Sequence, residues 1–117
     1  MVGLSACGPR LDSKHIMARV TSPDGKHDAI SVRDMSGGAT VGPTDELFVV
    51  RRGAAHKKSD RVAWVERACH FEARWLDDDL VEVTYFARRD TRDQSVSKSP
   101  SVGVRYRWLG RDAVSGC

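Results

Sequence analysis

The stretch HIMARVTSPDGKHDAISVRD, residues 15–34, decides the fold of this chain. At its centre, SPDGK (residues 22–26) is a turn sequence: proline presets its backbone angle, aspartate caps the turn, and glycine accepts a positive φ. Apolar residues alternate with polar or larger ones on both sides of the turn, namely Ile16, Ala18 and Val20 before it and Ile30 and Val32 after it. Alternation on both sides of such a turn predicts a β-hairpin.

Three later segments also have strand patterns. Leu47–Val50 is a short apolar run typical of a central strand, and Leu80–Phe86 is rich in β-branched and aromatic residues. The most regular alternation places Val102, Val104, Tyr106 and Trp108 on one face. Loops are expected over 35–44, 53–60 and 87–100, and a turn at Asp77-Asp78-Asp79.

Residues 61–76 fit two different structures. As strands, they place Val62 and Trp64 on one face and then Cys69, Phe71, Ala73 and Trp75 on one face. As a helix over 61–74, Trp64, Ala68, Phe71 and Trp75 recur at helical spacing. Both alternatives stay open. The whole pattern predicts an all-β fold, an antiparallel sheet or small β-sandwich of five to seven short strands, with this one helix as the exception.

The chain has 117 residues, which suits one domain. We expect an N-terminal tether over 1–14, a single β-rich domain over 15–110 and a C-terminal tail over 111–117. The apolar share of 40% allows a core that needs no disulfide or metal, and no run of 18 apolar residues is present.

Nineteen basic and 16 acidic residues give a net charge of +3, which is too small an excess to favour a nucleic-acid binder. Several basic residues nevertheless border one loop: Arg51, Arg52, Lys57, Lys58 and Arg61. Together with Arg105 and Arg107, they predict a basic surface that contacts an anionic partner, namely lipid head groups, polysaccharide or nucleic acid. Aromatic residues are not interleaved there, so single-strand binding is disfavoured.

The N-terminal sequence Leu4-Ser5-Ala6-Cys7 resembles a bacterial lipobox, in which the chain is cleaved before the cysteine and the thiol receives a lipid. We therefore expect lipid attachment at Cys7. A lipoprotein signal peptide needs a positive region and an apolar run upstream, and six uncharged residues do not supply them. This expectation therefore requires a signal that was trimmed or a start codon that was misassigned; otherwise the chain is cytoplasmic.

The other two cysteines, Cys69 and Cys117, also have two interpretations. In an oxidising compartment they could form a disulfide. Otherwise Cys69 is a buried thiol and Cys117 a free one. Spacing alone does not decide between these alternatives.

Three motifs together suggest a resemblance. The SPDGK turn, the GGAT loop at residues 37–40 and the WLDDDL strand pair at residues 75–80 are similar to those of an uncharacterised bacterial family of small β-rich envelope proteins and lipoproteins. The resemblance covers roughly residues 15–85. It implies a β-rich fold, strand over helix for 69–75 and location in the cell envelope. It transfers no catalytic residue.

No candidate catalytic, cofactor-binding or metal-ligating residue emerges. The four histidines, His15, His27, His56 and His70, lack zinc-site spacing, and His15 and His27 are expected to lie opposite each other in the first hairpin. We therefore expect a non-enzymatic, lipid-anchored envelope protein on the periplasmic side of a membrane. It would act as a binding or structural module for an envelope protein or polyanion. The alternative is a cytosolic module that contacts a polyanion through its basic loops.

Overall fold

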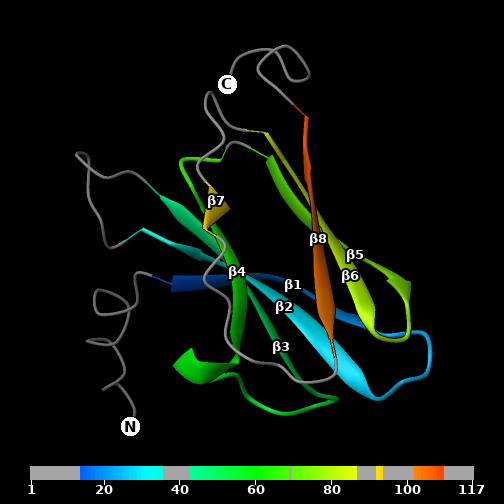
Figure 1. The fold of residues 1–117 in the computed structure, drawn as a ribbon. Helices are drawn as coiled ribbons and strands as arrows, with labels where there is room; N and C mark the ends of the chain where they lie inside the picture. Colours follow the sequence, from blue (N-terminus) through cyan, green and yellow to red (C-terminus); the bar gives the residue numbers. More distant parts are fainter. Residues whose placement is uncertain (1–13, 36–42, 69, 87–91, 94–101, 110–117) are drawn as a thin grey trace, which may run out of the picture.

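The larger of two β-sheets is built mainly from the N-terminal half of the chain (Figure 1). The computed structural model describes residues 14–35, 43–68, 70–86, 92–93 and 102–109. The strands lie in the order β1-β2-β3-β4-β7, and each pairs antiparallel with its neighbours. They are β1 (Lys14–Thr21), β2 (His27–Asp34), β3 (Thr44–Arg51), β4 (Arg61–Glu66) and the two-residue β7 (Arg92–Asp93).

The predicted hairpin is confirmed as β1 and β2. Gly25 has a φ of 76°, and its backbone N–H donates to the carbonyl of Ser22 over 2.8 Å. The turn fixes a register in which Thr21 faces Asp28. His15 therefore faces Arg33, whereas His27 faces Arg51 of β3, so the expectation that the two histidines oppose each other is wrong.

The smaller sheet contains β5 (His70–Asp77), β6 (Leu80–Phe86) and β8 (Gly103–Trp108), in the order β5-β6-β8. β5 and β6 form an antiparallel hairpin, whereas β8 lies parallel to β6. The all-β prediction is confirmed, and the helix over 61–74 is wrong. The chain bends between β4 and β5 at Arg67, which has a φ of 55°. Along β5, Phe71, Ala73 and Trp75 then share the face that packs on the core, as the strand alternative predicted.

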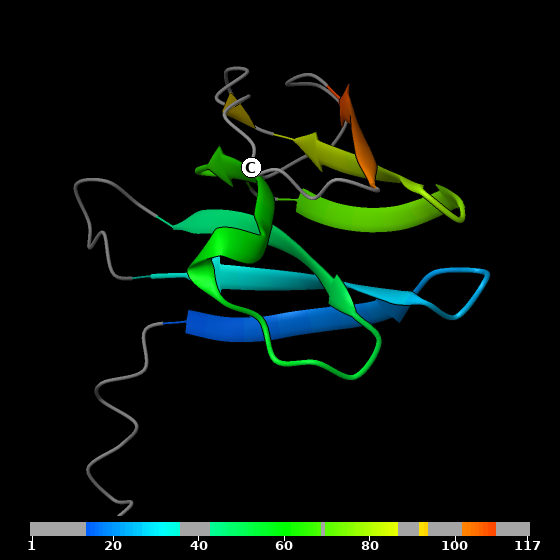
Figure 2. The ribbon, with the colours of Figure 1, turned by 60° about the horizontal axis from the view of Figure 1, so that its bottom comes forward.

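The main core lies between the two sheets, which form stacked layers in Figure 2. The larger sheet contributes Leu47 and Val49, and the smaller sheet contributes Val81, Val83 and Tyr85. Each of these five side chains is at most 5% exposed. Burying such apolar surface between two sheets is what allows a chain of this length to fold without cross-links.

A second apolar cluster lies on the opposite face of the larger sheet, which we call the outer face. It consists of Ile30, Val32, Phe48 and Val50, with Ala54 packed against it. β2 and β3 are therefore buried on both faces, which explains why Leu47–Val50 is a continuous apolar run rather than an alternating one. Figure 2 shows the loop that follows β3 crossing this side of the sheet before it reaches β4.

Two expected loops contain regular structure. The loop over 53–60 ends in a short 3-10 turn, η3 (Lys58–Asp60). The loop over 87–100 contains β7, which pairs with Trp64 and Val65 of β4. The first strand begins at Lys14, one residue before the expected domain boundary. The remainder of the tether, the GGAT loop at 37–40 and the tail at 111–117 lie outside the described residues.

Candidate functional site

A cavity of about 370 Å³ lies on the outer face of the larger sheet, and we call it the outer-face cavity. All four long strands of that sheet and the loop after β3 contribute to its wall. The lining residues are Lys14, Asp34, Glu46, Phe48, His56, Lys57, Lys58 and Arg61. Its volume falls in the range of pockets that hold small molecules.

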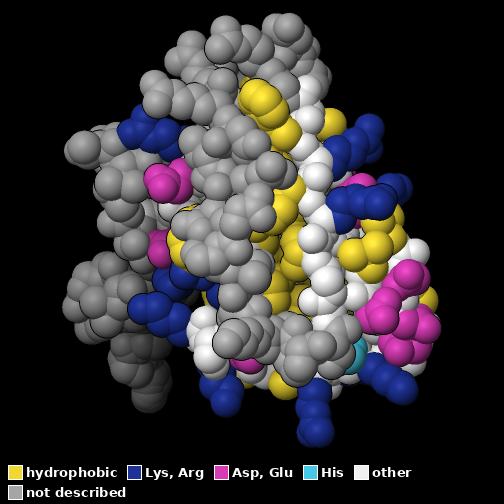
Figure 3. Space-filling model, in the orientation of Figure 1, with side chains coloured by type: hydrophobic (Ala, Val, Ile, Leu, Met, Phe, Trp, Pro, Cys, Tyr) yellow, Lys and Arg dark blue, Asp and Glu magenta, His cyan; other side chains and the backbone are white. Residues whose placement is uncertain are grey.

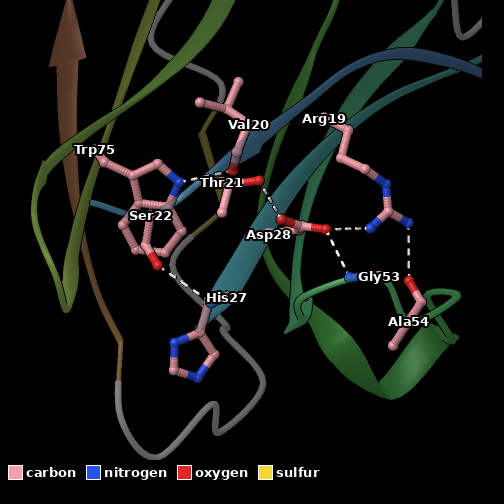
Figure 4. Close-up of polar contacts among 9 residues, drawn as sticks. All are labelled: Arg19, Val20, Thr21, Ser22, His27, Asp28, Gly53, Ala54 and Trp75. Carbon is pink, nitrogen blue, oxygen red and sulfur yellow. Dashed lines mark hydrogen bonds and ion pairs between the residues drawn. The ribbon is translucent and has the colours of Figure 1, made fainter. Parts of the chain in front are cut away.

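The loop that forms one side of this cavity is fixed to the sheet by Asp28 of β2 (Figure 4). The carboxylate of Asp28 accepts a hydrogen bond from the backbone N–H of Gly53 over 2.9 Å and from the guanidinium of Arg19. Arg19 also donates to the carbonyl of Ala54 over 2.8 Å. These contacts hold the start of the loop, at Gly53 and Ala54, against β1 and β2. They therefore fix where the backbone begins its path toward the cavity.

Asp28 is only 2% exposed, yet its surroundings favour the ionised form of its carboxyl group. The backbone N–H of Gly53, together with the hydrogen bonds from Thr21 and Arg19, lowers the pKa of this carboxyl below its ordinary value and outweighs the effect of burial. A charged acceptor of three donors is well satisfied. Asp28 therefore works as a structural anchor for the loop.

The end of the loop is fixed by η3. The carboxylate of Asp60 accepts a hydrogen bond from the backbone N–H of Lys57 over 2.8 Å, and the backbone N–H of Asp60 donates to the Lys57 carbonyl over 2.9 Å. These two hydrogen bonds between Lys57 and Asp60 hold the backbone of Lys57 and Lys58 beside the cavity, while the two lysine side chains remain exposed.

One wall of the cavity is aromatic. The ring of His56 lies 4.5 Å from the ring of Phe48, centroid to centroid, at an interplanar angle of 41°. Phe48 belongs to the buried outer-face cluster, and His56 is half-buried above it. The loop thus presents a ring surface to the cavity next to its two lysines.

Two acidic residues of the wall are already paired with cations. Glu46, which is 4% exposed, accepts a hydrogen bond at Oε2 from Arg61 over 2.8 Å. The ammonium of Lys14 lies 3.8 Å from Glu46 Oε1 and 3.7 Å from Asp34. The guanidinium of Arg61 also stacks on the ring of Trp64, 3.5 Å from its centroid.

The remaining charge of the cavity is positive. Four lining residues are basic, Lys14, Lys57, Lys58 and Arg61, and two are acidic, Asp34 and Glu46. Within the described ranges, the side chains of Lys57 and Lys58 form no ion pair. The two lysines are therefore available to an anion.

The structure divides the basic residues that were predicted to form one surface. Lys57, Lys58 and Arg61 line the cavity, while Arg51 and Arg52 lie at the start of its loop. Arg105 and Arg107 are exposed on β8, in the smaller sheet. That sheet packs against the inner face of the larger one, so β8 is separated from the cavity by the core (Figure 2).

The three cysteines Cys7, Cys69 and Cys117 lie outside the described residues. Their predicted roles, lipid attachment at Cys7 and a disulfide between the other two, therefore stay predictions.

The acidic turn between β5 and β6 is solvent-exposed, and Figure 3 shows acidic side chains gathered there. Asp77 accepts a hydrogen bond from the backbone N–H of Asp79 over 3.0 Å, which lowers the pKa of Asp77, while the proximity of Asp77 raises the pKa of Asp79. In the part of the chain that the structure describes, no three histidine, cysteine or acidic residues are grouped as a metal site.

Sequence reasoning missed Lys14, Asp34, Glu46, Phe48 and His56 as cavity residues. They come from four separate segments, which meet only after the loop folds back over the sheet. A weak signal was present in Glu46, a charged residue directly before an apolar run. A charged side chain that becomes buried in a strand is usually paired with an opposite charge.

No family model, curated protein or solved structure matches the chain. The resemblance to a family of bacterial envelope proteins therefore stays a prediction. Across the described ranges, no helix is both long and apolar enough to cross a membrane.

Proposed function

We propose that this protein is a non-enzymatic binding module that holds an anionic group in the outer-face cavity. The observation that carries this proposal is the charge of the cavity wall. Its carboxylates, Asp34 and Glu46, are paired with Lys14 and Arg61, whereas Lys57 and Lys58 have no ion-pair partner among the described residues. An anion that enters the cavity meets two adjacent ammonium groups whose charge is not already neutralised.

The fixed loop supports the proposal. Because Asp28 holds Gly53 and Asp60 holds the backbone of Lys57, the backbone that carries the two lysines needs little ordering when an anion binds. Preorganised groups give up less conformational entropy on binding than mobile ones. The wall is therefore arranged as a receptor before a ligand is present.

A binding role also agrees with where the perturbed carboxyl groups lie. Asp28 and Asp45 are both buried, and each is held by an arginine, Arg19 and Arg33 respectively. Neither aspartate lines the cavity. Groups with shifted pKa values at the site itself are a common mark of catalysis, and these two serve the sheet instead.

Isothermal titration calorimetry with inorganic pyrophosphate tests the proposal. The double variant Lys57→Gln/Lys58→Gln should lose most of the binding seen in the wild type, and wild-type binding should weaken as salt is added. The matched control is Arg105→Gln/Arg107→Gln, which removes the same charge from β8 and should bind like the wild type. Absence of wild-type binding, or equal loss in both variants, contradicts the proposal.

We further propose that the module is anchored to an envelope membrane through Cys7. Support comes from the likeness of Leu4-Ser5-Ala6-Cys7 to a lipobox. Expressing the gene with its upstream codons in a bacterium and labelling with a tagged fatty acid tests the anchor. Label on the wild type that disappears in Cys7→Ser supports it. An unlabelled wild type, or a label that persists in the variant, favours the cytosolic alternative, a module that contacts a polyanion through the same lysines.

A further inference from the structure

Glu46 has an unusual position for a carboxylate. Its Oε2 atom accepts a hydrogen bond from Arg61, but its Oε1 atom is buried and receives no hydrogen bond from any described residue. The ammonium of Lys14 lies 3.8 Å away, which is too far for a hydrogen bond. Buried polar atoms in folded proteins nearly always have a hydrogen-bond partner, so this one requires an explanation.

The place of Glu46 offers that explanation. It lines the same cavity as Lys57 and Lys58, and it is 4% exposed. The nearby ammonium of Lys14, whose side chain is 51% exposed on the edge strand, does not hydrogen-bond to Oε1. A ligand in the cavity that carries a hydrogen-bond donor can then supply the bond that Oε1 lacks.

The charges around Glu46 decide which donor fits. Lys14 and Arg61 already bring two positive charges to this carboxylate. A ligand ammonium would add a third beside them and would be repelled. A hydroxyl group donates a hydrogen bond without adding charge. The carboxylate therefore favours a hydroxyl over an amine.

We propose that the ligand of the outer-face cavity is a hydroxylated anion, namely a phosphorylated sugar or polyol. Its phosphate contacts Lys57 and Lys58, a hydroxyl donates to Oε1 of Glu46, and its carbon ring lies against the wall formed by His56 and Phe48. The cavity volume of about 370 Å³ accommodates a molecule of monosaccharide size. This inference rests on the proposed anion-binding function and specifies the chemical class of the ligand.

Calorimetric titration with glucose 6-phosphate and with inorganic phosphate tests the inference. The wild type should bind glucose 6-phosphate about tenfold more tightly than phosphate, because a hydrogen bond to a charged acceptor contributes an effect of that order. In Glu46→Gln, phosphate should bind at least as well as in the wild type, since a negative charge is gone, and the preference for glucose 6-phosphate should fall toward one. Lys57→Gln/Lys58→Gln should weaken both ligands and preserve their ratio.

The outcomes separate this inference from the proposed function. If the wild type binds phosphate and glucose 6-phosphate equally, the inference fails and the anion site stands. If it binds neither those ligands nor pyrophosphate, both fail. The wild-type comparison needs no variant, so it decides the question even if Glu46→Gln does not fold. Competition by vesicles that contain phosphatidylinositol distinguishes a lipid-borne sugar phosphate from a free one, and either result supports the ligand class.

Discussion

The indole nitrogen of Trp75 in β5 donates a hydrogen bond over 2.8 Å to the backbone carbonyl of Val20 in β1 (Figure 4). The two residues are 55 positions apart in the chain and belong to different sheets. This bond therefore links the edge strand of the larger sheet to the smaller sheet, at the end of the predicted hairpin.

Replacing Trp75 with phenylalanine should remove this bond and keep an aromatic ring on the core. We expect the free energy of unfolding to fall by about 1 kcal/mol, the usual net value of one hydrogen bond. Urea denaturation followed by circular dichroism measures the change. Arg107→Gln, on an exposed position of the same sheet, is the control and should leave stability unaltered.

Leu47 is fully buried between the sheets, so Leu47→Ala should lower the free energy of unfolding by about 3 kcal/mol through lost burial and a residual cavity. Ile16→Ala provides the contrast. Ile16 is 60% exposed on β1, and its truncation should cost less than about 0.5 kcal/mol. Similar losses for the two variants would mean that the sheets do not pack as described.

Asp28→Asn should loosen the loop beside the cavity. The variant keeps the size of the side chain but removes the charge that accepts bonds from Arg19, Thr21 and Gly53. We expect a loss of about 2 kcal/mol in stability and faster hydrogen exchange at the Gly53 amide. Asp78→Asn, in the exposed β5–β6 turn, should change neither quantity.

The pH dependence of stability should also report Asp28. Its pKa is lower in the folded protein than in the unfolded chain, so its contribution is present above the unfolded pKa and is lost as pH falls through the folded pKa. Asp45 acts in the opposite sense, because desolvation raises its pKa and its protonation relieves that penalty. The stability difference between the wild type and Asp28→Asn should therefore stay constant at neutral pH and shrink as the pH falls below about 4, the ordinary pKa of an aspartate. A difference that also stays constant below this pH would show that Asp28 is not a charged anchor.

Much of the fold could be predicted from the sequence because its signals are local. The turn at Gly25 and the alternation on both sides of it define β1 and β2, and the apolar run from Leu47 to Val50 marks a strand buried on both faces. The parallel pairing of β6 with β8 could not be predicted from the sequence. It depends on how the chain crosses between the sheets, and neither strand's sequence encodes the direction of its neighbour.

The cavity was only partly predictable. The density of basic residues around Lys57 and Lys58 marked the loop as a contact region. The sequence could not show that this loop folds over β3, which brings Glu46 and Lys14 to the lysines, or that β8 carries Arg105 away from them. Charge is visible in a sequence, whereas the grouping of charges depends on long-range packing.

The parallel β6–β8 pair has a consequence for biosynthesis. β6 is the middle strand of its sheet, so until residues 103–108 leave the ribosome, one edge of β6 has no neighbour. An unpaired edge can associate with other chains, and pairings between distant segments form slowly. Protection from aggregation during synthesis therefore depends on β8, the last strand that the structure describes, and chains that terminate before it would be the first to aggregate.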